Sequence, residues 1–247
     1  MKRLAYTALA TVMLAMPASA FDLSAMSDSE RQVFRDEVRS YLLDNPEVLM
    51  EAIAVLEQRK SEAQMNQDEM LVQVNADALF TDDYSYVGGN PDGDITVVEF
   101  LDYKCGYCKK AHPEVTALIN GDGNIRYIVK EFPILGDQSM LAARFAISTL
   151  NNLGTEAYEQ VHEALMVFRG DISEASLKRV AADLDLDTDT ILAGMDGEDV
   201  TNVIAANHAL AQRMQISGTP SFIMGDQMLR GYVPLDGMLA IVDELRG

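Results

Sequence analysis

The chain has 247 residues, and its 39 acidic residues outnumber its 19 basic ones, which gives a formal net charge of −20. This excess of negative charge argues against nucleic acid or an anionic membrane surface as a partner. The length suits one large domain or two small ones.

The N-terminus has the pattern of a secretory signal peptide. Lys2 and Arg3 precede an apolar run over residues 4–16, and an Ala-x-Ala site ends at Ala20. The apolar run is too short to span a bilayer comfortably, which disfavours the alternative of a membrane anchor. We therefore expect residues 1–20 to be removed by cleavage after Ala20 and the protein to be exported.

Residues 21–80 form a predicted helical arm. A capping box at residues 27–30 begins one helix, and a second helix runs from Glu47 to about residue 79 without an internal glycine or proline. Apolar residues seven apart mark a weak coiled-coil seam: Leu49, Leu56, Ala63 and Met70. A stripe this narrow cannot be buried by one helix alone. Either the arm folds back on its own domain or it pairs with copies of itself, and the narrow stripe favours an oligomer.

A second domain is expected over residues 81–247, after a turn-rich boundary at residues 81–94. Strand 95–101, helix 106–119 and strand 125–132 imply a parallel pair with a right-handed crossover. Only helices are expected from about residue 137 to 214. A hairpin over 221–229 and a final helix over 234–245 then complete one α/β layer that carries a helical insert.

Cys105 and Cys108 are the only cysteines of the chain, and they lie between the first strand of this domain and its helix. A structural disulfide with a two-residue spacer contributes little loop entropy, so this pair is better explained as reactive. Unpaired N–H groups at a helix N-terminus favour a thiolate. We expect Cys105 to be the exposed nucleophile, with a pKa lowered from about 8.5 into the range of about 3.5–7.5, and Cys108 the resolving thiol.

Other uses of the two cysteines are less favoured. A zinc site needs four ligands, and the chain adds only three histidines far apart in sequence, among them His112, which we interpret as a surface residue. Copper(I) could bind the same two soft thiols, and this alternative stays open.

Glu99 lies six residues before Cys105 in a strand expected to be buried. A buried carboxylate is costly unless its pKa rises or a partner compensates it, and Lys130 is a candidate partner. The alternative is an exposed Glu99 on a half-buried strand.

Three motifs together resemble the DsbA-type thioredoxin-fold thiol–disulfide oxidoreductases over about residues 86–245. They are the strand end with Glu99 before the Cys-Gly-Tyr-Cys motif, the segment Lys130-Glu131-Phe132-Pro133, and Gly218-Thr219-Pro220. The arm is similar to that of the ScsC branch, the suppressor-of-copper-sensitivity proteins.

The resemblance implies a thioredoxin fold with an inserted helical domain, preceded by an N-terminal oligomerisation arm. It further implies a periplasmic location, a trimer, and a cis peptide bond between Thr219 and Pro220. These two residues would offer backbone groups to an extended substrate, and Glu99 would move protons for the buried cysteine.

The dipeptide between the cysteines bears on the direction of exchange. Gly106 and Tyr107 place no imidazole beside the thiolate, so the pair should be less oxidising than in strongly oxidising DsbA enzymes. Gly-Tyr is also the dipeptide of the isomerase DsbC. We therefore predict a disulfide isomerase or reductase that acts on misfolded or disulfide-bonded exported proteins. It would use a membrane thiol reductase as redox partner, and no cofactor besides the redox-active Cys105–Cys108 disulfide. The alternatives are a dedicated oxidase of DsbA type and a copper(I)-binding protein.

Overall fold

The computed structural model describes residues 26–247, so the expected signal peptide lies outside the described residues. The chain divides into two compact units, one that ends at Arg59 and one from Lys60 to Gly247. The helix α2, Glu47–Val74, contains the boundary between them.

In the first unit, α1 (Asp28–Asp44) precedes the start of α2. The expected capping box is present: the Glu30 N–H donates to Ser27 Oγ at 3.4 Å, and the Ser27 N–H donates to Glu30 Oε2 at 2.8 Å. No residue of α1 is buried, although the helix carries several large apolar side chains. The first unit therefore leaves an apolar surface without a partner in its own chain segment.

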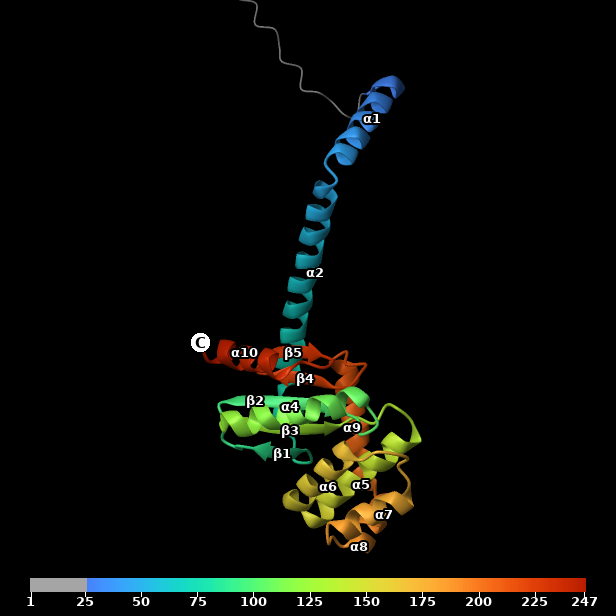
Figure 1. Cartoon of the computed structure of the whole chain (residues 1–247), viewed down its shortest axis with the longest axis vertical. Coiled ribbons are helices and arrows are strands. Elements are labelled where there is room, and N and C mark those ends of the chain that lie inside the picture. Colours follow the sequence, from blue (N-terminus) through green and yellow to red (C-terminus); the bar gives the residue numbers. More distant parts are fainter. Residues whose placement is uncertain (1–25) are drawn as a thin grey trace, which may run out of the picture. The chain divides into compact units, whose positions relative to one another are not determined.

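The second unit is built on a five-stranded sheet (Figure 1). Its strands follow the spatial order β1-β3-β2-β4-β5, with bounds Tyr86–Gly89 (β1), Ile95–Leu101 (β2), Ile125–Glu131 (β3), Ser221–Met224 (β4) and Gln227–Arg230 (β5). The pair β2–β3 is parallel, and every other pair is antiparallel. Both the predicted parallel pair and the predicted hairpin are confirmed. The central strand β2 is flanked on both sides, which is why its residues form an almost continuous apolar run.

Helices cover both faces of this sheet. On one face, α4 (Gly106–Asp122) and α10 (Leu235–Arg246) pack on alternate residues of β2 and β3, such as Val97 and Val129. On the other face, α3 (Ala76–Phe80) and α9 (Glu198–Arg213) pack on the intervening residues, such as Val98 and Ile128. The period-2 alternation of the strands thus separates two apolar cores.

The predicted helical insert is present between β3 and β4. Its helices are α5 (Asp137–Leu153), α6 (Thr155–Val167), α7 (Glu174–Asp183), α8 (Thr188–Gly194) and α9. Figure 1 shows α5 to α8 gathered beyond the β1 edge of the sheet, where α6 contacts β1. The architecture is the one expected from the resemblance.

Three details differ from the sequence-based expectations. Residues 86–89, interpreted as part of a turn-rich boundary, form strand β1, because β3 supplies a partner that local sequence does not reveal. The helix predicted to run to residue 79 breaks at Asn75, whose side chain donates to the Leu71 carbonyl at 2.9 Å. Residues 60–80, assigned to the arm, belong to the second unit, where Val72 and Leu79 are buried in its core.

Candidate active site

Cys105 is the N-cap residue of α4, directly after the end of β2. Its backbone is extended, and its sulfur accepts a hydrogen bond from the Cys108 N–H at 3.4 Å. An N-cap side chain faces the unpaired N–H groups of the first helical turn, and these groups stabilise negative charge. The fold therefore places the first cysteine where a thiolate is favoured.

The expectation that Cys105 is exposed is wrong, because only 7% of its surface is accessible. The segment before β4 lies over it, and the Cys105 thiol donates to the Thr219 carbonyl oxygen at 3.2 Å. Both cysteines are free thiols in this structure, so it represents the reduced form of the pair. Cys108 is completely buried.

The two thiols have opposite acidities. Hydrogen bonding from the Cys108 side chain, helped by the side chain of Thr219 and the N–H groups of Cys108 and Tyr107, lowers the pKa of Cys105 to about 5, although burial opposes this shift. Burial raises the pKa of Cys108 far above its ordinary value, and the bond to Cys105 and the charge of Glu99 add to this effect. At neutral pH, Cys105 is therefore a thiolate while Cys108 keeps its proton.

The loop before β4 contains Thr219 and Pro220, and the peptide bond between them is cis, as the resemblance implied. Pro220 is buried, and its carbonyl oxygen accepts from the Gly231 N–H at 2.9 Å. The Thr219 carbonyl is occupied by the Cys105 thiol only while that sulfur carries a proton. Ionisation of Cys105 would free this acceptor beside the sulfur.

Glu99 is buried, with 1% of its surface accessible, so the alternative of an exposed strand residue is wrong. Tyr127 of the neighbouring strand β3 donates its hydroxyl proton to Glu99 Oε2 at 2.5 Å, whereas Oε1 has no hydrogen-bond partner. Burial raises the pKa of Glu99 to about 7, and the Tyr127 bond moderates the rise. Glu99 can therefore gain or lose a proton near neutral pH.

The suggested partner of Glu99 lies elsewhere. Lys130 points to the opposite face of the sheet, because it is an odd number of residues from Tyr127 along β3. There its ammonium group pairs with Asp82 and donates to the Ala78 carbonyl at 2.8 Å. The hypothesis that Lys130 pairs with Glu99 is wrong.

His112 is buried rather than a surface residue. It lies on α4 and contacts Glu163 of α6 through Nε2 at 2.8 Å. The ring of His162 packs edge-on against it at a centroid distance of 5.3 Å. His112 therefore belongs to the contact between α4 and the helical insert.

A second buried carboxyl, Glu131, was not singled out as a site residue. Its Oε1 accepts from the hydroxyls of Tyr103 at 2.7 Å and Tyr158 at 2.6 Å, and burial raises its pKa to about 8. In the parallel register, Glu131 lies opposite Leu101 and shares the α4 face with Glu99 and Tyr127. The period-2 pattern of the predicted strand 125–132 could have placed both residues on the face of Glu99.

The dipeptide between the cysteines forms the accessible rim of the site. Tyr107 is 63% exposed, and a Cβ added at Gly106 would meet nothing within 4 Å. Within residues 26–247, no group of three or more His, Cys, Asp or Glu side chains is arranged to hold a metal ion. The arrangement is suited to thiol chemistry: an acidic nucleophile, a buried second thiol and a carboxyl that titrates near pH 7.

Comparison with known proteins agrees with this chemistry. A family model described as Thioredoxin matches residues 81–244, and one described as Copper resistance protein ScsC N-terminal domain matches residues 30–63. A thioredoxin-like oxidoreductase from Silicibacter pomeroyi is 41% identical, with 69% of this chain and 96% of that chain covered and a TM-score of 0.65. The thiol–disulfide exchange protein α-DsbA2 from Wolbachia pipientis is 30% identical, with 74% and 98% covered and a TM-score of 0.70. ScsC from Proteus mirabilis, in a transitional conformation, is 28% identical, with 90% and 98% covered and a TM-score of 0.65.

Among curated relatives, the chain spans 24% of the length of two Na⁺/H⁺ antiporters from Salinispora species. In the part of the chain that the structure describes, no helix has the length and apolar character needed to cross a membrane. The family-model match covers more than half of the chain and contains the two cysteines, Glu99 and the cis-proline loop. The chain therefore belongs to the thioredoxin family, and it is similar to thiol–disulfide oxidoreductases of the DsbA and ScsC type.

Proposed function

We propose that the protein is a periplasmic disulfide isomerase or reductase that acts on misfolded or disulfide-bonded exported proteins. The observation that carries the proposal is the opposite acidity of the two thiols, with the pKa of Cys105 at about 5 and that of Cys108 raised by burial. A periplasmic thioredoxin-like protein from Salmonella enterica is among the similar structures, and it supports the location.

The reaction begins at Cys105. Its thiolate attacks one sulfur of a substrate disulfide, which forms a mixed disulfide and releases the other substrate sulfur as a thiolate. During this step the substrate backbone can pair with the cis-proline loop, because the Thr219 carbonyl no longer accepts a bond from a Cys105 thiol. Thr219 and Pro220 would thus hold an extended substrate beside the sulfur.

The mixed disulfide has two outcomes. In reduction, Glu99 takes the proton of Cys108, and the Cys108 thiolate attacks Cys105, which forms the intramolecular disulfide and expels the substrate thiolate. In isomerisation, a second substrate thiolate attacks first and regenerates the Cys105 thiolate. Burial keeps Cys108 protonated, which slows its attack on the mixed disulfide. A slow attack by Cys108 leaves more time for the attack by a second substrate thiolate, and this favours isomerase activity.

Reduction leaves the protein oxidised, so a source of electrons is needed to restore the dithiol. We propose a membrane thiol reductase for this role. The absence of an imidazole at Gly106 and Tyr107 fits such a cycle, because a less stabilised thiolate corresponds to a less oxidising pair.

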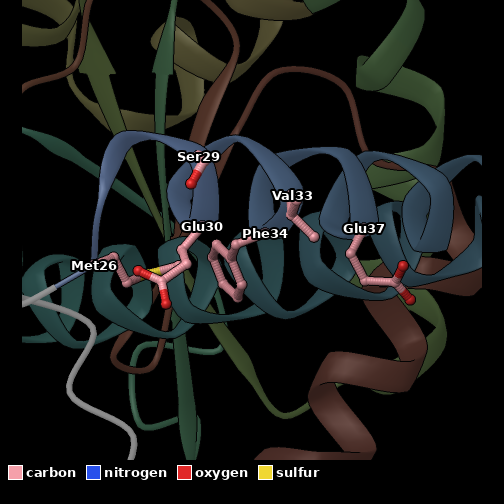
Figure 2. Close-up of a pocket in the computed structure, with 6 residues that line it drawn as sticks. All are labelled: Met26, Ser29, Glu30, Val33, Phe34 and Glu37. Atoms are coloured by element: carbon pink, nitrogen blue, oxygen red, sulfur yellow. The ribbon is translucent and has the colours of Figure 1, made fainter.

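We propose that the first unit makes the protein an oligomer, and that several copies together hold a large substrate. The resemblance to ScsC proteins leads us to expect a trimer. On α1, Val33, Phe34, Val38 and Tyr41 are between 41% and 69% exposed. Figure 2 shows Val33 and Phe34 between the carboxylates of Glu30 and Glu37. These residues line a hollow of about 460 Å³. Burial of this apolar surface between copies of the arm would stabilise an oligomer.

The direction of exchange is tested by refolding of scrambled ribonuclease at a defined glutathione poise, together with insulin reduction. We expect reactivation of the scrambled protein, with the activity lost in Cys105→Ser and isomerisation partly retained in Cys108→Ser. Oxidation of reduced substrates without any reactivation would instead identify a dedicated oxidase.

Oligomerisation is tested by light scattering of residues 21–247 and of residues 60–247, a truncation that keeps Val72 and Leu79 in the core. We expect an oligomer and a monomer, respectively. Val33→Asp with Phe34→Asp should dissociate the full-length protein, whereas Arg39→Asp, which changes the charge by the same amount on the opposite side of α1, should not. Monomers throughout would remove the oligomer from the proposal.

Copper(I) binding by Cys105 and Cys108 is the second candidate function, and the ScsC-type match of residues 30–63 favours it. Binding would require Cys108 to lose its proton, which its burial opposes. Titration with copper(I) against a competing chelator tests it: a complex that withstands the chelator and is lost in Cys108→Ser would establish the site.

A further inference from the structure

A cavity of about 230 Å³ lies beside the active site, between α4, α6 and the strands β1 and β3. It is separate from the accessible rim at Tyr107 and the cis-proline loop. Its walls carry several groups that can exchange protons: Tyr86, His112, Tyr127, Glu159, His162 and Glu163. None of these groups has a role in the exchange steps described so far.

Tyr127 is the group that joins this cavity to the active site. Its side chain lines the cavity, and its hydroxyl donates to Glu99 Oε2 at 2.5 Å. Within residues 26–247, the Glu99 carboxyl accepts a hydrogen bond from Tyr127 alone, because its other oxygen, Oε1, has no partner. Glu99 itself is closed off from solvent, with 1% of its surface accessible. A proton on Glu99 therefore has the Tyr127 hydroxyl as its hydrogen-bonding neighbour.

The far side of the cavity reaches solvent through exposed carboxylates. Glu159 accepts from the Tyr86 hydroxyl at 2.6 Å, and Glu163 contacts His112 at 2.8 Å. Both glutamates are exposed residues of α6. A cavity of this size with several polar groups can hold water. A path of groups thus connects a buried carboxyl to bulk solvent. It begins at Glu99, continues through Tyr127 and the cavity, and ends at Glu159 and Glu163.

We propose that Tyr127 is a positioning residue for disulfide exchange, which holds the Glu99 carboxyl and connects it to the cavity between α4 and α6. The inference rests on the proposed role of Glu99. When Cys108 attacks, its proton moves to Glu99, the sulfur–sulfur bond between Cys105 and the substrate breaks, and the Cys105–Cys108 bond forms. Glu99 then passes its proton through the Tyr127 hydroxyl to water in the cavity, and the expelled substrate thiolate takes a proton from solvent.

The charges around this path set the direction of the expected pH effect. Glu99 faces the two cysteines of α4 and Tyr127 of β3, while the buried Glu131, with Tyr158 of α6, lies nearby on the same face of the sheet. The Tyr127 bond lowers the pKa of Glu99, against the effect of burial. Loss of this hydroxyl would therefore raise the pKa of Glu99 further.

The test is Tyr127→Phe, which keeps the ring and removes the hydroxyl. A mixed disulfide with a fluorescent glutathione derivative is formed on Cys105, and the rate of its resolution by Cys108 is followed from pH 5 to 9. For the wild type we expect a midpoint near pH 7. For Tyr127→Phe we expect the midpoint to rise by about one pH unit, the size of a lost hydrogen bond to a charged group, and the plateau rate to fall about tenfold.

Tyr86→Phe is the matched control, because it removes a hydroxyl from the same cavity without touching Glu99. Its midpoint should equal that of the wild type. The rate of mixed-disulfide formation, which does not involve the Cys108 proton, should be unchanged in Tyr127→Phe. Equal slowing of both steps would indicate a merely structural role for Tyr127 and overturn the inference.

Glu99→Gln separates this inference from the proposed function. If the pH dependence is lost in Glu99→Gln and Tyr127→Phe adds nothing further in that background, both stand. If Glu99→Gln loses the pH dependence but Tyr127→Phe behaves as wild type, Glu99 keeps its role and the role of Tyr127 is overturned. If Glu99→Gln behaves as wild type, the proposed role of Glu99 fails and the inference fails with it.

Discussion

The buried carboxyl of Glu99 should make the stability of the protein depend on pH, and Glu99→Gln should remove the part of that dependence that Glu99 contributes, while the part due to Glu131 remains. Burial raises the pKa of Glu99 from its ordinary value of 4.5 to about 7. The folded state therefore binds a proton that the unfolded state has lost between these pH values, so stability falls as the pH rises through this window. The folded and unfolded pKa values of Glu99 differ by about 2.5, which corresponds to about 3 kcal/mol of unfolding free energy.

The assay is urea unfolding of the reduced protein at pH 4.5 and at pH 8, for the wild type and for Glu99→Gln. Glutamine keeps the shape of the side chain and cannot ionise. We compare the free energy of unfolding of Glu99→Gln with that of the wild type at each pH. This difference should shift in favour of the variant by about 3 kcal/mol between pH 4.5 and pH 8. Glu244→Gln, at an exposed position, controls for the loss of a surface charge and should show no such gain. A difference between Glu99→Gln and wild type that is the same at both pH values would refute a raised pKa at Glu99.

Three further predictions follow from other contacts. Asp82→Asn should destabilise the protein by about 3–5 kcal/mol in urea unfolding, because it leaves the buried ammonium of Lys130 without its ion-pair partner, and adding Lys130→Met should restore most of this loss. The redox potential, measured by equilibration with glutathione, should lie between about −270 and −120 mV, and a value at the −120 mV end would favour an oxidase. Tyr107→His should make the pair more oxidising by about 30 mV for each unit by which it lowers the pKa of Cys105; an unchanged potential would show that position 107 does not set it.

The sequence was informative where local pattern and short-range geometry decide the structure. The spacing of the cysteines after an apolar strand placed Cys105 at the start of α4, since a strand followed by a helix leaves few other geometries. The turn at Gly225 and Asp226 fixed the hairpin of β4 and β5 for the same reason. The strand around Glu99 was long and apolar enough to predict its burial.

Features that depend on distant partners could not be predicted in this way. Cys105 is covered by Thr219, a residue 114 positions away, so its low exposure has no local signal. Strand β1 exists because β3 pairs with it, and Gly89, at φ 66°, allows the backbone to approach Ile125 closely. Lys130 was a plausible partner for Glu99 by its charge, but the alternation of β3 directs it to the opposite face of the sheet.

The central claim is that the fold makes Cys105 an acidic nucleophile, and the pH dependence of its alkylation tests this claim most directly. The reduced protein is treated briefly with iodoacetamide over a range of pH, and labelling at Cys105 is quantified by mass spectrometry, while Cys108 stays protected by its burial. The structure predicts a midpoint at about pH 5, with a higher midpoint in Cys108→Ala, since Cys108 is the largest cause of the shift. A midpoint near the value of free cysteine, about 8.5, would contradict the account.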